Sequence, residues 1–232
     1  FYKRHLFSVI INASGYTDVE KAEDEIDPAY QVNAKGPENL YFLSEAFPVK
    51  IVHFSTDYVF DGKKNRFYRE DDFCNPINVY GKSKREGEIF ILKNPENLVI
   101  RTSWLIGNGK NFVKTIYKKI REEKMIKVVY DQVGRLTFVQ DLVKAAWQLL
   151  PFKGIFHVSN RGSASWYEIS EKILSLSKDV CCRKILPVLS EDLFFKAKRP
   201  KYSVFSIEKM ENICSIPHWE DRLEEYLKRG VL

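Results

Sequence analysis

The side chains that point most directly to chemistry lie between Ser55 and Glu88. Tyr80 and Lys84 are four residues apart, so in a helix they would share one face. A free phenol has a pKa of about 10, and an adjacent ammonium favours the phenolate and lowers that pKa. A tyrosine tuned in this way can give a proton to a developing alkoxide or take one from an alcohol. The pair therefore indicates acid–base chemistry at an oxygen atom.

A small hydroxyl side chain precedes this pair. Residues 51–54 (IVHF) are apolar enough to form a buried strand, and Ser55, Thr56 and Asp57 follow at its end. A strand end and a helix face can meet at one cleft, where Thr56 would hold the reacting oxygen. The arrangement suits hydride transfer to or from a carbonyl, with the hydride supplied by a nicotinamide. Of the twelve tyrosines, only Tyr80 has a lysine four residues on, although the same spacing also occurs on exposed helix surfaces.

The sequence around these residues is more specific than the spacing. Between Val9 and Ser203 it contains, in order, VIINASGYTDVEKAE, VNAKGPENL, STDYVFDG, NVYGKSKREGE, IRTSWLIG, NFV, DQVGRLT and RPKYS. Thr56, Tyr80 and Lys84 resemble the Ser/Thr-Tyr-Lys triad of the extended short-chain dehydrogenase/reductase superfamily. The whole series resembles the dTDP-4-dehydrorhamnose reductase family, over nearly the whole chain.

The resemblance implies a reaction and a role for each member of the triad. The enzyme would reduce the C4 ketone of a dTDP-linked 4-keto-6-deoxy sugar, dTDP-6-deoxy-L-lyxo-4-hexulose, to dTDP-L-rhamnose with NADPH or NADH. Tyr80 would protonate the nascent alkoxide, and Thr56 would bond the carbonyl oxygen. Lys84 would lower the pKa of Tyr80 and hold the nicotinamide ribose. A homodimer is also compatible with the resemblance.

Two other classes of protein share these residues. The regulatory subunit of methionine adenosyltransferase resembles the same family and works by docking to a partner, and a fold can persist after its function has changed. Nucleotide-sugar epimerases and dehydratases of the superfamily use the same tyrosine and lysine. Net cofactor consumption separates the enzymes, because reductases use the cofactor up, whereas epimerases and dehydratases recycle it.

The resemblance assigns further contacts, several of which have a simpler alternative. The cofactor would contact Asn12, Ala13, Ser14, Tyr16, Asn33, Ser55, Tyr80 and Lys84. The substrate would contact Thr56, Asp57, Trp104, Asn111, Phe112 and Arg199. Alternatively, Asn12 is a turn residue that satisfies its own backbone, and Asn33 is an exposed helix position. Trp104 and Phe112 can fill core, and Arg199 can lock two lobes together or lie in an exposed loop.

Strands alternate with helices along the chain, which predicts an α/β fold with a mainly parallel, Rossmann-like sheet flanked by helices. We expect a cofactor domain at residues 1–103 and 137–160, and a smaller α/β substrate lobe at 104–136 and 161–232. Strands are expected at 6–11, 49–55, 98–102, 127–130, 154–158 and 181–188. Helices are expected at 28–47 (with Asp27 as N-cap), from Tyr80 to about 92, and at 111–123, 138–150, 166–176 and 220–228.

The superfamily fold opens with a strand, a Gly-rich turn and a helix that seat the cofactor diphosphate. Neither G-x-G-x-x-G nor G-x-x-G-x-x-G occurs in this sequence. We therefore expect the N-terminal βα units to be missing from this chain, so that the cofactor domain is incomplete. The alternative is a short protein that cannot hold a dinucleotide tightly.

The composition of the chain limits which other classes of protein are possible. With 232 residues, 44% of them hydrophobic, the chain can bury a sizeable core. Its net charge of +6 comes from basic residues scattered among acids, which favours a solvated surface over a nucleic-acid site. The apolar runs are strand-sized, so no membrane span is expected. The four cysteines have no C-x-x-C spacing, so no metal site is predicted, and reduced thiols fit a cytoplasmic enzyme.

Overall fold

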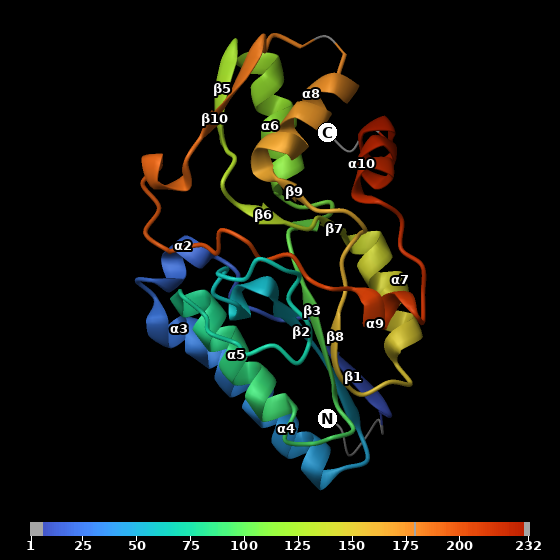
Figure 1. Cartoon of the computed structure of the whole chain (residues 1–232). Helices are drawn as coiled ribbons and strands as arrows, with labels where there is room; N and C mark the ends of the chain where they lie inside the picture. Colours follow the sequence, from blue (N-terminus) through green and yellow to red (C-terminus); the bar gives the residue numbers. More distant parts are fainter. Residues whose placement is uncertain (1–6, 179, 230–232) are drawn as a thin grey trace.

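A four-stranded parallel sheet forms the centre of the computed structural model, which describes residues 7–178 and 180–229 (Figure 1). Its strands are β1 (Val9–Asn12), β2 (Lys50–Thr56), β3 (Leu98–Thr102) and β8 (Gly154–His157). They lie in the order β1-β2-β3-β8, and each neighbouring pair is parallel. The predicted mainly parallel sheet is therefore confirmed. Leu6, at the start of the first predicted strand, lies outside the described residues.

Helices cover both faces of this sheet (Figure 1). On one face, α4 (Gly36–Ala46) and α5 (Val79–Ile91) pack against Ile51 and Val99. On the other, α7 (Val139–Leu149) and α9 (Glu208–Glu211) pack against Val52 and Ile100. Adjacent strand residues point to opposite faces, so β2, in which both Ile51 and Val52 are buried, needs a layer on each side.

A second hydrophobic cluster lies beyond the carboxyl ends of the strands, in the upper part of Figure 1. It joins α6 (Phe112–Glu122), α8 (Trp166–Leu176) and α10 (Trp219–Lys228) to the parallel pair of β5 (Met125–Val129) and β10 (Lys184–Val188). Two short pairs connect the clusters: β4 (Leu105–Ile106) with β7 (Thr137–Phe138), and β6 (Val133–Gly134) with β9 (Ala164–Ser165).

The predicted division into a cofactor domain and a substrate lobe stays a prediction. The two clusters follow it in outline. However, residues between Val204 and Ile216, which were assigned to the substrate lobe, pack in the cluster of the central sheet.

The predicted helix at residues 28–47 differs in detail from the observed one. It begins two residues earlier, as α3 (Ile26–Tyr30), with Glu25 rather than Asp27 in the N-cap position. It then passes through a π-helical turn, η1 (Gln31–Lys35), before α4 begins. Short helical turns α2 (Val19–Ala22), η2 (Asp57–Val59) and η3 (Ser190–Asp192) complete the described elements.

The predicted strand at residues 181–188 was too long at its start. The backbone N–H groups of Cys181 and Cys182 both donate to the carbonyl of Ile120, at 3.0 and 2.8 Å. The C-terminal end of α6 therefore uses the hydrogen bonds that a strand would need, because the last carbonyls of a helix lack partners within it. The strand begins only at Lys184.

A buried ion pair joins α5 to the central strand β3. Nε and Nη2 of Arg101 each lie 2.8 Å from an oxygen of Glu88, and both side chains are at most 1% exposed. Arg85 contacts the same carboxylate at 2.7 Å. Burial alone would raise the pKa of Glu88, but the Arg101 guanidinium outweighs it and holds that pKa at about 2. The helix thus has one fixed position along the strand.

We expect Glu88→Gln to lower the free energy of unfolding by about 3–5 kcal/mol at neutral pH, because Arg101 would be left buried without its counter-charge. Since the folded-state pKa of Glu88 is depressed from 4.5 to about 2, the wild type should lose stability as pH falls through that range. The variant should lack this part of the acid sensitivity. Urea unfolding at several pH values measures both effects.

The matched control is Glu96→Gln, which removes an exposed carboxylate 2.7 Å from Lys153. This substitution should leave stability nearly unchanged, because solvent screens an exposed pair. Equal losses in the two variants would contradict a special role for the buried pair.

Candidate active site

The structure brings Thr56, Tyr80 and Lys84 to one place. Thr56 ends β2, and Tyr80 lies in the first turn of α5. The Thr56 side chain lies close to the Tyr80 phenol. One helical turn later, Nζ of Lys84 donates to the carbonyl of Phe54 in β2 at 2.6 Å. Thr56 and Lys84 are buried, and Tyr80 is partly buried.

The N-terminus of α5 is held by polar contacts from outside the helix. The Asn78 side chain accepts from the N–H of Gly81 at 2.7 Å, and Glu23 accepts from the N–H of Val79 at 2.8 Å. These contacts satisfy N–H groups that have no partner within the helix. A Cβ atom at Gly81 would lie 2.2 Å from the carbonyl oxygen of Tyr58. Only glycine therefore lets the helix approach closely enough for Tyr80 to reach Thr56.

The electrostatics of the trio differ from the expectation that Lys84 lowers the pKa of Tyr80. Burial raises the pKa of Tyr80 to about 12, whereas the nearby Thr56 side chain lowers it. Burial also lowers the pKa of Lys84 to about 8. The ammonium is directed to the Phe54 carbonyl rather than to the phenol. Tyr80 is therefore a neutral phenol at neutral pH, with its proton in place.

The loop after β1 lies beside Lys84. A Cβ atom built on Gly15 would be 3.9 Å from Nζ of Lys84. Asn33 is buried and fixes this loop: it accepts from the N–H of Tyr16 at 2.9 Å and donates to its carbonyl at 3.0 Å. Asn33 also donates to Ser83 of α5, at 3.0 Å. The alternative of an exposed polar helix position was therefore wrong.

The other predicted cofactor residues have varied surroundings. Asn12 is a turn residue, because its Oδ1 accepts from the N–H and the hydroxyl of Ser14 at 3.1 and 2.6 Å. Ala13 and Ser14 are exposed. The Tyr16 phenol donates to Glu25 at 2.6 Å, and this bond raises its pKa to about 12. Ser55 is buried beside Glu88. Cofactor contact by these residues stays a prediction.

Trp104 has an unusual backbone and a crowded ring. Its φ of 44° lies in the left-handed region, which is rare for a bulky residue. The ring stacks on Trp166 with centroids 3.5 Å apart, and a Cβ atom at Gly134 would lie 2.6 Å from it. Phe112 contacts Trp166 in turn, at 4.3 Å. These rings form an aromatic stack, and their contact with a substrate stays a prediction.

Two predicted substrate residues already have partners within the protein. Asn111 caps α6, since it accepts from the N–H of Lys114 at 3.0 Å and donates to the carbonyl of Gly107 at 2.8 Å. Arg199 lies 2.5 Å from Glu20 and stacks over Phe195. Arg199 thereby joins the late loop to the turn around α2, which is the locking role among its alternatives.

Asp57 is buried and connects distant parts of the chain. Its carboxylate accepts from the hydroxyls of Thr56 at 3.1 Å and Ser203 at 2.6 Å. Four residues that contact the predicted site residues were not predicted from the sequence: Ser203, Asn78, Glu23 and Trp166. Asn78, directly before the helix, carried a capping signal that could have been used. Ser203 was quoted in a motif without a role, and Glu23 and Trp166 gave no distinguishing signal.

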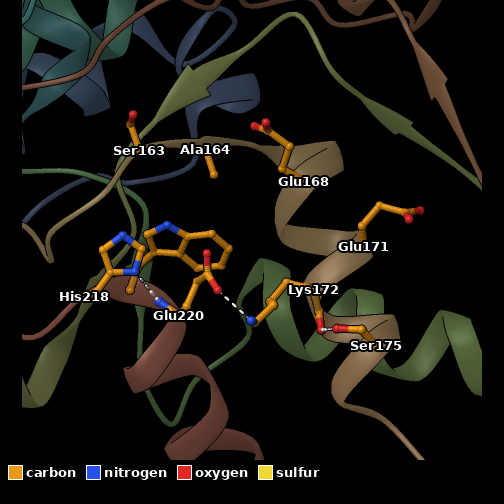
Figure 2. Close-up of a pocket in the computed structure, with 9 residues that line it drawn as sticks. Ser163, Ala164, Glu168, Glu171, Lys172, Ser175, His218 and Glu220 are labelled. Atoms are coloured by element: carbon orange, nitrogen blue, oxygen red, sulfur yellow. Dashed lines mark hydrogen bonds and ion pairs between the residues drawn. The ribbon is translucent and has the colours of Figure 1, made fainter.

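A further pocket lies away from these residues. Figure 2 shows this cavity of about 500 Å³ between α8 and the start of α10, lined by Lys172, His218 and Glu220 among others. Lys172 and Glu220 form an ion pair across it. None of the predicted site residues lines this pocket, so the pocket is not the predicted active site.

The residues present fit the ribose end of a nicotinamide cofactor. An ammonium carries three N–H donors, and Lys84 donates one of them to the carbonyl of Phe54. The ammonium also lies beside the loop that follows β1, residues 12–16. Its remaining N–H groups suit the hydroxyls of a ribose.

In the part of the chain that the structure describes, no group of His, Cys, Asp and Glu side chains could hold a metal ion. The same residues contain no helix that is both long and apolar enough to cross a membrane.

Comparisons with known proteins agree with this geometry. The family model described as RmlD substrate binding domain matches residues 1–231. The spore coat polysaccharide biosynthesis protein SpsK of Bacillus subtilis is 40% identical over 97% of this chain and 82% of its own length.

Two solved structures are also similar over most of their length. The dTDP-4-dehydrorhamnose reductase of Clostridium acetobutylicum is 36% identical, with a TM-score of 0.95 over 100% of this chain and 84% of that one. The reductase of Bacillus anthracis, in complex with NADP, is 38% identical, with a TM-score of 0.92 over 98% and 83%. The chain therefore belongs to the dTDP-4-dehydrorhamnose reductase family.

Proposed function

We propose that this protein reduces the C4 ketone of dTDP-6-deoxy-L-lyxo-4-hexulose to give dTDP-L-rhamnose, with NADPH or NADH as the reductant. The observation that carries this proposal is the neutral Tyr80 phenol close to the Thr56 side chain, with the Lys84 ammonium one turn away. The family supports the same reaction, and one similar reductase structure contains NADP.

The residues of this chain act on the oxygen of the ketone. The bound cofactor supplies a hydride to the carbonyl carbon. Tyr80 then gives its proton to the developing alkoxide, which is more basic than a phenolate, so the transfer is favourable. Lys84 holds the ribose through its free N–H groups. Thr56 bonds the carbonyl oxygen of the substrate, where a fixed polar group needs little reorganisation.

The substrate would occupy the space between the central sheet and the second cluster. We place its sugar near Trp104 and Phe112, and its diphosphate near Arg199, whose guanidinium can pair with phosphate oxygens. In this proposal residues 104–136 and 161–232 form the substrate lobe. A homodimer also remains part of the proposal.

Replacing Tyr80 by Phe removes only the phenolic hydroxyl, and we expect kcat to fall by about 10²–10⁴-fold because the general acid is lost. The assay follows the ketone-dependent loss of NADPH absorbance. Tyr41→Phe, on α4, is the matched control and should keep wild-type turnover. Near-normal turnover in the Tyr80 variant would remove this residue from the proposed role.

Replacing Lys84 by Met keeps the chain length but removes the donors, and the affinity for NADPH should fall by about 10–100-fold, the usual worth of a charged hydrogen bond. A fluorescence titration with NADPH measures it. Lys82→Met, an exposed lysine on the same helix, should bind NADPH as the wild type does. Equal affinities in all three proteins would show that Lys84 does not hold the ribose.

The same assay separates the alternative classes. A reductase consumes one NAD(P)H for each ketone reduced, whereas an epimerase or a dehydratase shows no net consumption. A regulatory subunit would show no turnover and would instead co-purify with a synthetase in stoichiometric amount. Either of these results would overturn the proposed reaction.

A further inference from the structure

A buried asparagine at the end of β1 turns the two polar atoms of its side chain in opposite directions. Oδ1 of Asn12 accepts from the N–H and the hydroxyl of Ser14, at 3.1 and 2.6 Å. Its Nδ2 lies 2.9 Å from Nδ1 of His53, which stands opposite it in the register of β1 and β2. Asn12 is 8% exposed and His53 is 1% exposed. One amide thus joins the loop after β1 to the interior of the sheet.

The partners of this amide determine where the hydrogen atoms lie. A backbone N–H can only donate, so the atom of Asn12 that faces Ser14 is the oxygen, and the NH₂ group faces His53. An NH₂ group also donates, so Nδ1 of His53 must accept and carries no hydrogen. The hydrogen of the neutral ring is then on Nε2. Among residues 7–178 and 180–229, Nε2 has no hydrogen-bond partner, so the contact with Asn12 sets the tautomer.

The surroundings of His53 keep its ring neutral. Burial and the Lys84 ammonium lower the pKa of His53 to about 3, whereas the Glu88 carboxylate raises it. Both of these charged groups come from α5. His53 follows Ile51 by two residues, so it points to the face of the sheet that α5 covers. On the β1 side it meets only the neutral amide of Asn12, and a charged ring would need a hydrogen on the nitrogen that this amide already occupies.

The loop at residues 12–16 is held by a buried amide at each end. At its far end, Asn33 bonds both backbone groups of Tyr16, at 2.9 and 3.0 Å. At its near end the anchor is Asn12. Between the anchors, a Cβ atom built on Gly15 would lie 3.9 Å from Nζ of Lys84. The loop also follows the carboxyl end of a parallel strand, where open α/β sheets bind their ligands.

We propose that His53 is a positioning residue for the cofactor, whose Nδ1 orients the Asn12 amide and thereby fixes the loop backbone beside Lys84. This inference rests on the proposed function, in which Lys84 holds the ribose. His53 itself is buried and does not touch the cofactor. Without an acceptor at position 53, the NH₂ group of Asn12 loses its partner, so the amide can turn and the loop loses its near anchor.

The first test reads the ring of His53 directly. Two-bond ¹⁵N–¹H correlation spectra of the full chain show which ring nitrogen carries the hydrogen, and His53→Asn assigns the signals. At neutral pH the hydrogen should be on Nε2. His157 is the internal control: its Nδ1 faces the Ser206 carbonyl at 3.2 Å and its Nε2 faces Arg101, so it should carry the hydrogen on Nδ1. The same tautomer in both rings, or a charged His53, would overturn the proposal.

Asn12→Asp reverses the direction of the hydrogen bond. A carboxylate oxygen in place of Nδ2 only accepts, so Nδ1 of His53 must then carry a hydrogen. The signals of His53 should therefore change, while those of His157 stay as in the wild type. If the ring of His53 keeps its hydrogen on Nε2 alone, Asn12 does not set the tautomer, and the proposal is wrong.

The functional test uses two substitutions that separate hydrogen bonding from packing. His53→Leu keeps most of the volume but removes the acceptor, and it should raise the Kd for NADPH by about 2–10-fold, the worth of one hydrogen bond. His53→Asn loses volume but keeps an acceptor near the position of Nδ1, so its Kd should stay close to that of the wild type. Fluorescence titration measures both, and urea unfolding shows that both are folded. A packing role predicts the opposite order of affinities, which would contradict the proposal.

Steady-state kinetics distinguish this role from the chemical step. In His53→Leu the loss should appear in KM for NADPH rather than in kcat, because Tyr80 and Lys84 keep their own contacts. A loss in kcat alone would contradict a role in positioning the loop. If the wild type binds no NADPH, the proposed function fails and this role fails with it. If the wild type and both variants at position 53 bind NADPH equally, only the role of His53 fails.

Discussion

The position of α5 depends on the buried bidentate pair between Glu88 and Arg101. Apolar packing favours burial without direction, so the contacts of Ile91 with the sheet could be met at several positions along the strand. A paired guanidinium and carboxylate in a low-dielectric interior tolerate only one geometry. Because Arg101 stands opposite Ser55 in the register of β3 and β2, the same pair also sets α5 against the end of β2. Tyr80, two turns earlier, therefore arrives beside Thr56.

Much of this architecture was predictable from the sequence because it rests on local signals. The alternation of apolar strands with amphipathic helices predicted the parallel sheet, and the helix expected at residues 166–176 is the observed α8, Trp166–Leu176. The meeting of Thr56 with Tyr80 followed from a strand end and a helix start. The π-helical turn, the displaced start of β10 and the contact of Ser203 with Asp57 were not predictable, because they depend on partners more than fifty residues away in sequence or on backbone geometry without a sequence signal.

The charges at the site show the limit of spacing arguments. Four-residue spacing placed Tyr80 and Lys84 on one face, but it could not show that a carbonyl of another element would attract the ammonium. Burial then changes both groups in the direction that favours their neutral forms, with pKa values of about 12 and about 8. For a reduction this is a useful resting state, since the phenol holds the proton that the product needs.

The π-helical turn at Gln31–Lys35 places one additional residue in a helix that otherwise has 3.6 residues per turn. Each residue of an α-helix advances the direction of the side chains by about 100°. Deleting a single residue there would restore a regular helix, yet it would rotate the faces of α3 and α4 against each other by roughly that angle. Either Asn33 would then lose its hydrogen bond with the backbone of Tyr16, or Leu40 would lose its packing against the sheet. The number of residues in that turn therefore sets how the faces of α3 and α4 are oriented relative to each other.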